Sequence, residues 1–143
     1  MKNQQGFSLI EILIALTLLA LIGTFVGSKI FDSLRDGKIN VARTQMGTLA
    51  QSLKAFRLDC GHYPTGENGL QALVEKPSGG KECKRYNPNG YLENEIPLDP
   101  WDNEYTYESD GRKFSIKSFG PDGLEGGEGR DEADIIFPEK RRK

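Results

Sequence analysis

The sequence is poor in histidine, and it carries no large net charge of either sign. Its 143 residues include a single histidine, and the formal net charge is −2. Such a small charge gives no electrostatic reason to expect nucleic-acid binding. The histidine, His62, falls in a loop, where we expect it at the surface, and one imidazole among scattered serines defines no Ser-His-Asp set. A phosphate-binding glycine loop is also lacking. We therefore predict neither an enzyme nor a nucleic-acid partner.

Cysteine is equally scarce, and Cys60 and Cys83 are the only two in the chain. An even count beyond a membrane segment favours a disulfide in an oxidising compartment, although two unrelated thiols are the alternative. A bridge would close a loop of about two dozen residues and add on the order of 3 kcal/mol to the free energy of unfolding. The sequence therefore makes Cys60–Cys83 a candidate disulfide.

Long apolar runs are confined to the N-terminus. The 22 residues from Phe7 to Ser28 read FSLIEILIALTLLALIGTFVGS, and Glu11 is their only charge. As a helix with a rise of about 1.5 Å per residue, this run spans roughly 33 Å, which matches a bilayer core. A cleaved secretory signal usually has a shorter apolar core. A plain signal anchor does not explain an intramembrane carboxylate, which is costly without a partner. Glu11 therefore calls for a function.

The leader MKNQQ-GFSLIE resembles that of type IV pilins and pseudopilins, in which a short polar leader ends in Gly and Glu follows shortly afterwards. The resemblance implies that a prepilin peptidase cleaves between Gly6 and Phe7 and methylates the new amino group of Phe7. Glu11 then becomes the fifth residue of the mature chain, where it can pair with the amine of a neighbouring subunit on assembly. Removing one partner of such a buried pair is costly. Residues 1–6 are thus a predicted cleaved leader, and residues 7–28 form the transmembrane and filament-core half of the helix.

The distribution of basic residues, taken alone, predicts the opposite orientation. Lys2 is the only basic side chain before the apolar run, whereas Lys29, Arg35, Lys38 and Arg43 follow it. The positive-inside rule would then place the C-terminal part in the cytoplasm. The leader motif and the cysteine pair favour the reverse. We therefore expect a single-pass protein of the bacterial inner membrane, with residues 29–143, including the second half of the helix, as a periplasmic head.

The remaining sequence predicts a helix followed by a small helix and short strands. A 4-3-4-3 spacing of apolar residues continues the first helix to about Leu58, before Gly61. These stripe positions are Ala42, Met46, Leu49, Leu53 and Phe56. The segment GENGLQALVEKP is typical of a short helix that stops at its proline. YTYES and KFSIKSF alternate in the manner of antiparallel strands, with a turn at residues 109–111 between them.

Three further segments, YPTGENGLQALVEKP, GYLENEIPLDPWDNEY and SFGPDG, resemble the major pseudopilins of type II secretion, the general secretion pathway protein G family. This resemblance extends from Gly6 to about Ile135. It implies an α+β, type IV pilin-like fold, in which a long N-terminal helix packs on a small head with a short antiparallel sheet and a calcium-stabilised C-terminal loop. Some positions depart from the family pattern; for example, Asp102 stands where Gly is usual, and Cys60 where Asn is more frequent.

The resemblance also implies a function and a set of partners. The chain would be a structural subunit that polymerises from the inner membrane into a helical homopolymer, the periplasmic pseudopilus, which drives export of folded proteins across the outer membrane. Minor pseudopilins, the inner-membrane secretion platform and the prepilin peptidase would be its partners. The alternative is a type IV pilin-like subunit for adhesion, motility or DNA uptake, although such pilins usually carry a C-terminal disulfide loop that is missing here. A membrane-anchored, calcium-dependent binding or enzymatic domain is a third hypothesis.

The C-terminal segment SFGPDGLEGGEGRDEADI is rich in acids and glycines, a composition that suits calcium but also a metal-free acidic loop. The resemblance favours calcium, held by the side chains of Asp122 and Asp134 and by the carbonyls of Phe119 and Leu124. Shorter loops of the family have two adjacent Asp residues, whereas this chain has Ala133 before Asp134. We therefore predict Asp131 as the second acid, with Glu128 or Glu132 as substitutes.

Overall fold

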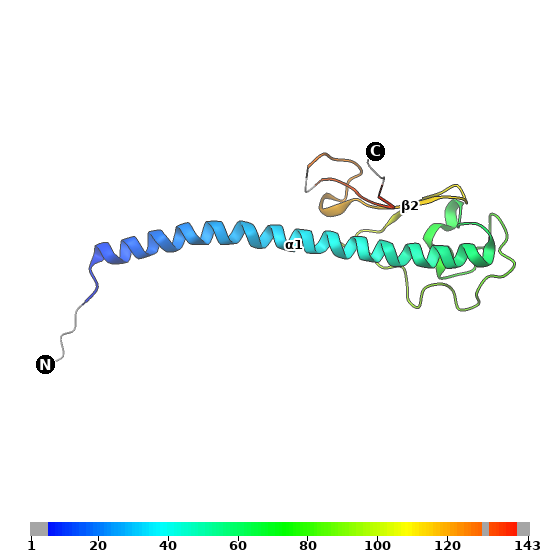
Figure 1. Ribbon diagram of the computed structural model, residues 1–143, viewed down its shortest axis with the longest axis horizontal. Helices are drawn as coiled ribbons and strands as arrows, with labels where there is room; N and C mark the ends of the chain where they lie inside the picture. Colours follow the sequence, from blue (N-terminus) through cyan, green and yellow to red (C-terminus); the bar gives the residue numbers. More distant parts are fainter. Residues whose placement is uncertain (1–5, 130–131, 140–143) are drawn as a thin grey trace. The chain divides into compact units, whose positions relative to one another are not determined.

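The computed structural model of the protein describes residues 6–129 and 132–139. The chain divides into two compact units, Met1–Gly37 and Lys38–Lys143. One long helix begins the described chain, and a small antiparallel sheet of order β1-β2-β3 lies in the second unit (Figure 1). In chain order, the elements are α1 (Leu9–Cys60), the 3-10 helix η1 (Gly66–Leu73), β1 (Thr106–Ser109), β2 (Phe114–Ser118), the 3-10 helix η2 (Gly120–Asp122) and β3 (Ile135–Phe137). The predicted α+β architecture is confirmed.

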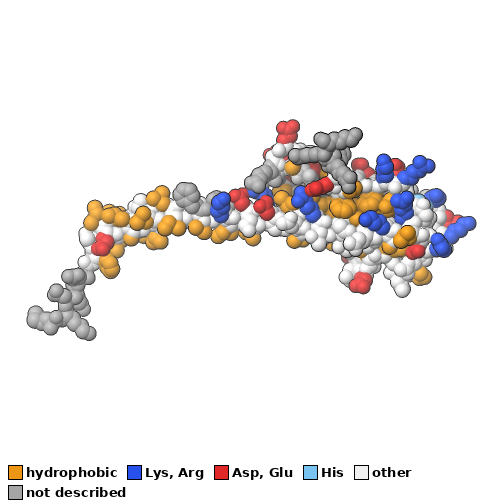
Figure 2. All heavy atoms as spheres, in the orientation of Figure 1, with side chains coloured by type: hydrophobic (Ala, Val, Ile, Leu, Met, Phe, Trp, Pro, Cys, Tyr) orange, Lys and Arg blue, Asp and Glu red, His pale blue; other side chains and the backbone are white. Residues whose placement is uncertain are grey.

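The first unit contains the N-terminal part of α1, which by length and composition includes a stretch able to cross a membrane. The large apolar side chains that the structure describes between Phe7 and Leu34 are exposed, and Figure 2 shows apolar side chains along this part of the helix. The hydroxyls of Thr17 and Thr24 donate to the helix's own carbonyls, at 2.7 and 2.8 Å. These two polar groups are therefore satisfied within the helix, which is the arrangement that an apolar surrounding requires.

The second unit is built on the apolar stripe of α1 that the residue spacing predicts. Ala42, Met46, Leu49, Leu53 and Phe56 are all at most 1% exposed, which confirms the prediction. Side chains from each later part of the head complete the same core, namely Leu70, Leu73, Ile116 and Ile135. One helix face thus supplies a continuous wall on which the small sheet and η1 pack.

The chain reverses direction directly after α1. Gly61 has φ of +78°, and its N–H donates to the carbonyl of Arg57 at 2.8 Å, which is an αL termination favoured by glycine. The helix therefore ends at Cys60, two residues later than predicted. Cys60 is joined to Cys83 by a disulfide, with 4.6 Å between their Cα atoms. This bridge attaches the loop after η1 to the end of α1.

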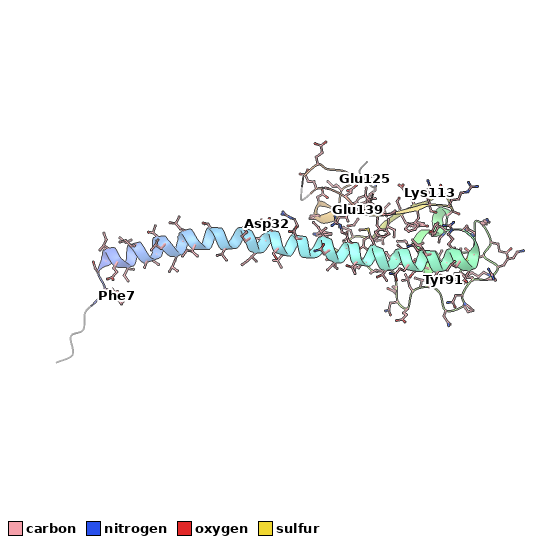
Figure 3. All side chains as sticks on the ribbon, in the orientation of Figure 1. Phe7, Asp32, Tyr91, Lys113, Glu125 and Glu139 are labelled. Carbon is pink, nitrogen blue, oxygen red and sulfur yellow. A yellow bond between two sulfur atoms is a disulfide. The ribbon has the colours of Figure 1, made fainter. Side chains whose placement is uncertain are left out.

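Aromatic side chains hold the same loop on the helix end. The hydroxyl of Tyr91, labelled in Figure 3, donates to a carboxylate oxygen of Asp59 at 2.9 Å. The ring of Tyr91 meets the rings of Phe56 and Tyr86 edge to face, each at 5.4 Å between centroids. The disulfide loop is therefore fastened by covalent, polar and aromatic contacts together.

Two sequence-based expectations for this region were wrong in detail. His62 is only 7% exposed, because the chain after Gly61 folds back onto the helix end and the imidazole packs edge to face against Phe56. Its Nδ1 atom also lies 2.9 Å from the carbonyl oxygen of Tyr63. The short helix expected after it is present as η1, but it is a 3-10 helix that is kinked at Gly69, where the backbone angles are non-helical. Glycine alone tolerates such a backbone without strain.

The predicted hairpin is present, and its turn is stabilised by local side chains. Tyr107 of β1 pairs with Ile116 of β2 in the antiparallel register. In the turn, the Asp110 carboxylate accepts the backbone N–H groups of Arg112 and Lys113, at 2.8 and 2.6 Å. β3 then adds to the other side of β2, where Ile135 pairs with Ser118. This last pairing brings the C-terminal loop back to the sheet.

Candidate functional site

The polar centre of the head is a buried carboxylate in the turn before β1. Asp99 is 3% exposed, and its Oδ1 atom accepts the N–H groups of Trp101 and Asn103, both at 2.9 Å. Its Oδ2 atom accepts the hydroxyl of Ser118 at 2.5 Å. The sequence DPWDN favours this local arrangement, because an Asp side chain readily binds backbone N–H groups two or more residues later. Asp99 therefore ties the turn to the end of β2.

The same turn supports the start of the C-terminal loop. The hydroxyl of Ser118 accepts the N–H of Gly120 at 3.2 Å, and the side-chain amide of Asn103 donates to the Gly120 carbonyl at 3.4 Å. Within the turn, Asp102 has φ of +67°, a left-handed conformation that glycine adopts most easily and that Asp tolerates. This conformation gives a physical reason for the glycine that the resemblance leads one to expect at this position.

The C-terminal loop folds back on itself between η2 and β3. Both carboxylate oxygens of Asp134 accept the N–H of Gly126, at 3.1 and 3.2 Å. Gly127 has φ of +97°, and a Cβ atom there would meet the carbonyl oxygen of Glu132. The Asp122 carboxylate accepts the N–H of Leu124 at 3.3 Å. Gly127 is thus needed for the close approach of the two sides of the loop.

A lysine of the sheet lies among the acids of this loop. The ammonium group of Lys117, in β2, pairs with the carboxylate of Glu125 at 2.6 Å, and Figure 3 labels Glu125 in the loop. The hydrogen bond that Lys117 donates to Glu125 raises the pKa of Lys117, and the charges of Glu125, Asp134 and Glu108 raise it further. The same bond lowers the pKa of Glu125. Part of the loop's negative charge is therefore offset by the protein itself.

The second candidate site is the start of α1. Phe7 precedes the helix and is 78% exposed, and Glu11 is an exposed residue in its first turn. A carboxylate in the first turn interacts favourably with the helix dipole. Among the described residues, no hydrogen bond or ion pair engages the Glu11 side chain. The carboxylate is thus presented on an apolar surface without a protein partner from the described part of its own chain.

Sequence comparisons match both parts of the chain. Residues 1–27 match the prokaryotic N-terminal methylation motif, and residues 29–137 match the family described as type II secretion system (T2SS), protein G. The chain belongs to the type II secretion protein G family. The two matched segments adjoin, so that the motif-bearing N-terminus and the head are found in the order of a pseudopilin.

Individual relatives agree with this assignment over nearly the whole chain. A type II secretion system core protein G of Pseudomonas aeruginosa is 38% identical over 136 residues, 94% of this chain and 94% of its own length. Its counterpart in Vibrio cholerae is 37% identical, over 90% of this chain and 88% of its own. The solved structure of the major pseudopilin of enterohaemorrhagic Escherichia coli superimposes with a TM-score of 0.65 at 32% identity, covering 74% of this chain and 87% of that one.

The described structure does not gather the calcium ligands predicted for this protein G chain into a metal site. Asp122 and Asp134 lie on the two sides of the folded-back loop, and Phe119 and Leu124 flank η2. Asp131 lies outside the described residues. Within residues 6–129 and 132–139, no three acidic, histidine or cysteine side chains are grouped to hold a metal ion. The loop offers carboxylate and carbonyl oxygens, which are the donors that calcium prefers. The donor types therefore fit calcium, whereas the full ligand set stays a prediction.

The sequence reasoning missed the positioning residues Asp99, Asn103 and Ser118. DPWDN lies within a segment that resembles the family, but the resemblance gives no role to Asp99. The missed signal is an Asp followed by Pro and, four residues later, Asn, which is typical of a turn closed by the Asp side chain. The hydrogen bond between Asp99 and Ser118 could not be predicted from the local sequence, because the two residues are 19 positions apart.

Proposed function

We propose that the chain is the major structural subunit of a type II secretion pseudopilus. Copies are held in the bacterial inner membrane by residues 7–28, with the head in the periplasm, and polymerise into a helical homopolymer that drives folded proteins across the outer membrane. The observation that carries the proposal is the exposed apolar half of α1 with one carboxylate in its first turn. Such a surface needs lipid or other copies to cover it. The proposal assigns the chain no catalytic activity.

Processing of the N-terminus is part of the proposal. A prepilin peptidase cleaves between Gly6 and Phe7 and methylates the amine of Phe7, as the match to the methylation motif supports. The carboxylate of Glu11 then accepts a charge-assisted hydrogen bond from the Phe7 amine of a neighbouring copy. In the low dielectric of the filament core this pair is far stronger than in water. Minor pseudopilins and the inner-membrane platform act with the chain at the base of the filament.

Calcium binding to the C-terminal loop is a further part of the proposal. Asp122 and Asp134 supply carboxylates, Phe119 and Leu124 supply carbonyls, and Asp131 completes the set. The ion would offset the repulsion that Lys117 offsets only in part, because Lys117 bears one positive charge and is paired with Glu125. Its role is structural, since a small head gains stability from any ligand that binds only the folded state.

A deletion strain tests the function directly. We compare its extracellular proteins and its surface pili with those of the parent and of a strain complemented with the intact gene. We expect secreted proteins to accumulate in the periplasm while pili persist, and complementation to restore secretion. Intact secretion with loss of pili, adhesion or DNA uptake would instead make the chain a type IV pilin-like subunit. A mature mass that retains residues 1–6 would contradict the processing step.

A further inference from the structure

One side of the head carries a groove whose charged residues are all acidic. The groove has a volume of about 570 Å³ and lies between η1, the segment before the Asp99 turn and the start of β1. Leu70 and Tyr105 are buried in its wall, and Glu75, Glu95 and Glu104 supply its charge. A shallower hollow continues from Glu95 and adds Glu93. Four exposed glutamates are thus gathered on one surface.

These glutamates have no cationic partner in the described part of the chain. The described ion pairs use other acids, namely Asp32, Glu125 and Glu139. Carboxylates that share a concave surface repel one another and concentrate a negative potential there. A ligand that brings several positive charges relieves this repulsion, and apolar contacts with the wall can add to its binding. The groove is therefore suited to a basic peptide.

The chain itself contains such a peptide. Residues 140–143 read Lys-Arg-Arg-Lys and lie outside the described residues. They follow Glu139, labelled in Figure 3, whose carboxylate pairs with Arg43 of α1 at 3.1 Å. The basic run thus begins shortly after β3, which is one edge of the sheet, whereas the groove is lined by residues at β1, the opposite edge. A copy's own basic run would have to cross the sheet to enter its own groove.

We propose that the basic run 140–143 of one copy docks into the glutamate groove of a neighbouring copy. This inference rests on the proposed function, because it requires the chains to assemble. The donor surface and the acceptor surface are different parts of the head. A contact of this kind is heterologous, and repeating it from copy to copy generates an open helical array where the rotation between copies does not close a ring. A reciprocal exchange of basic runs between two copies would instead give a closed dimer, so the one-directional contact is the form that a filament requires.

Each ion pair between the basic run and the glutamate groove should strengthen the association of two copies only modestly, whereas the whole set of pairs should strengthen it appreciably. An exposed ion pair changes an association constant by roughly two- to fivefold, and several pairs that act together multiply their effects. Added salt weakens such contacts between exposed charges. The interface therefore contributes to the order and salt sensitivity of head packing, while the helices provide the apolar contacts.

The test uses the full-length chain in cells that assemble the filament. A photo-activated cross-linker replaces Leu98, which lines the groove and is 48% exposed. Light and isotopically heavy copies are mixed, so that a cross-link between copies is distinguished from one within a copy. The variants are K140E/R141E/R142E/K143E in the basic run, E75K/E95K/E104K in the groove, and the two sets combined. The matched control, K81E/K84E/R85E, reverses exposed cations elsewhere on the head.

We expect light–heavy cross-links from position 98 to the segment around residues 139–143. Each set of reversals alone should reduce them by at least about tenfold, the combination should restore them, and the control should retain them. Restoration by the combined variant also shows that the reversals do not unfold the head. Cross-links only within a copy, or only to a different protein, would overturn the inference. If filaments and secretion were normal in that case, the proposed function would still stand. If the unmodified chain formed no filaments, both the inference and the proposed function would be refuted.

Discussion

The Asp99 carboxylate should be the most sensitive single position in the head. Replacing it with Ala removes the acceptor for three hydrogen bonds at once, from Trp101, Asn103 and Ser118. The Ser118 side chain is fully buried, so its hydroxyl proton would have no water to replace the lost partner. Leaving a buried donor unsatisfied costs about 1–3 kcal/mol. The two backbone N–H groups lie nearer the surface, so each loss should cost less.

The sum predicts that Asp99→Ala lowers the free energy of unfolding by about 2–5 kcal/mol, which is a large share of a typical small domain's stability. Asp99→Asn should cost less, on the order of 1–2 kcal/mol, because its amide oxygen can still accept the two backbone N–H groups. The charge-assisted bond to Ser118 is lost in both variants. A graded order, Ala worse than Asn, therefore distinguishes hydrogen-bond loss from simple loss of charge.

The assay is urea unfolding of the full-length chain in detergent micelles, followed by fluorescence. Trp101 is the only tryptophan and lies within the turn itself, so its emission reports this region. Glu82→Gln, at an exposed position in the disulfide loop, serves as the control and should change the free energy of unfolding by no more than about 0.5 kcal/mol. An Asp99→Ala variant as stable as this control, with an unchanged urea dependence, would refute the reasoning.

The remaining predictions concern assembly, the disulfide, alkaline stability and calcium. Glu11→Gln should reduce filament assembly and secretion without unfolding the head, as measured by sheared filaments and by extracellular protein. Replacing Cys60 and Cys83 with Ser should lower the free energy of unfolding by roughly 3 kcal/mol, because the bridge spans 23 positions. Burial raises the pKa of Tyr107 from 10.0 to about 12. The neutral phenol of Tyr107 therefore contributes its full stabilisation of the fold below about pH 10, and this contribution is lost as the pH rises toward 12. Stability measured by urea unfolding should consequently fall less steeply with rising pH in Tyr107→Phe than in the unmodified chain. Chelation should lower the melting temperature of the intact chain, and added calcium should restore it.

Each of these has an outcome that would count against it. Asp36→Asn changes another exposed carboxylate of α1 and should leave assembly normal; equal defects in both variants would remove the special role of Glu11. Reductant should destabilise the unmodified chain but not the Cys-to-Ser variant. A Tyr107→Phe variant as alkali-sensitive as the parent would place the titrating group elsewhere. A melting curve that is identical with chelator and with calcium would refute the metal site.

The elements that could be predicted from sequence are those specified by neighbouring residues. The apolar stripe of α1 and the β1–β2 hairpin follow from periodicity and from the Ser109–Gly111 turn, which act over short distances. The position of Glu11 in its apolar run can also be read from the sequence, because the leader resemblance depends on its spacing from Gly6. The family resemblance can likewise be recognised from the sequence, because it rests on short motifs of neighbouring residues.

The features that could not be predicted depend on contacts distant in sequence. His62 is buried because the chain folds back onto Phe56 and not because of its neighbours. The role of Asp99 required knowledge that Ser118 lies beside it. The acidic groove likewise combines residues from η1 with residues before and within β1, and no local pattern connects Glu75 with Glu104. Tertiary proximity, and not local propensity, determines each of these.

The exposed half of α1 also indicates which interactions decide assembly in the proposed pathway. In that pathway lipid would cover its apolar side chains before assembly and other helices would cover them afterwards, so their burial would change little between the two states. Helices that leave a lipid surrounding gain no hydrophobic free energy from meeting one another, and packing and polar contacts must favour association instead. The Glu11 carboxylate is the ionisable group that α1 offers in its first turn. A single charge pair at this position, together with the polar contacts of the head, can therefore control whether a copy stays in the membrane or enters the filament.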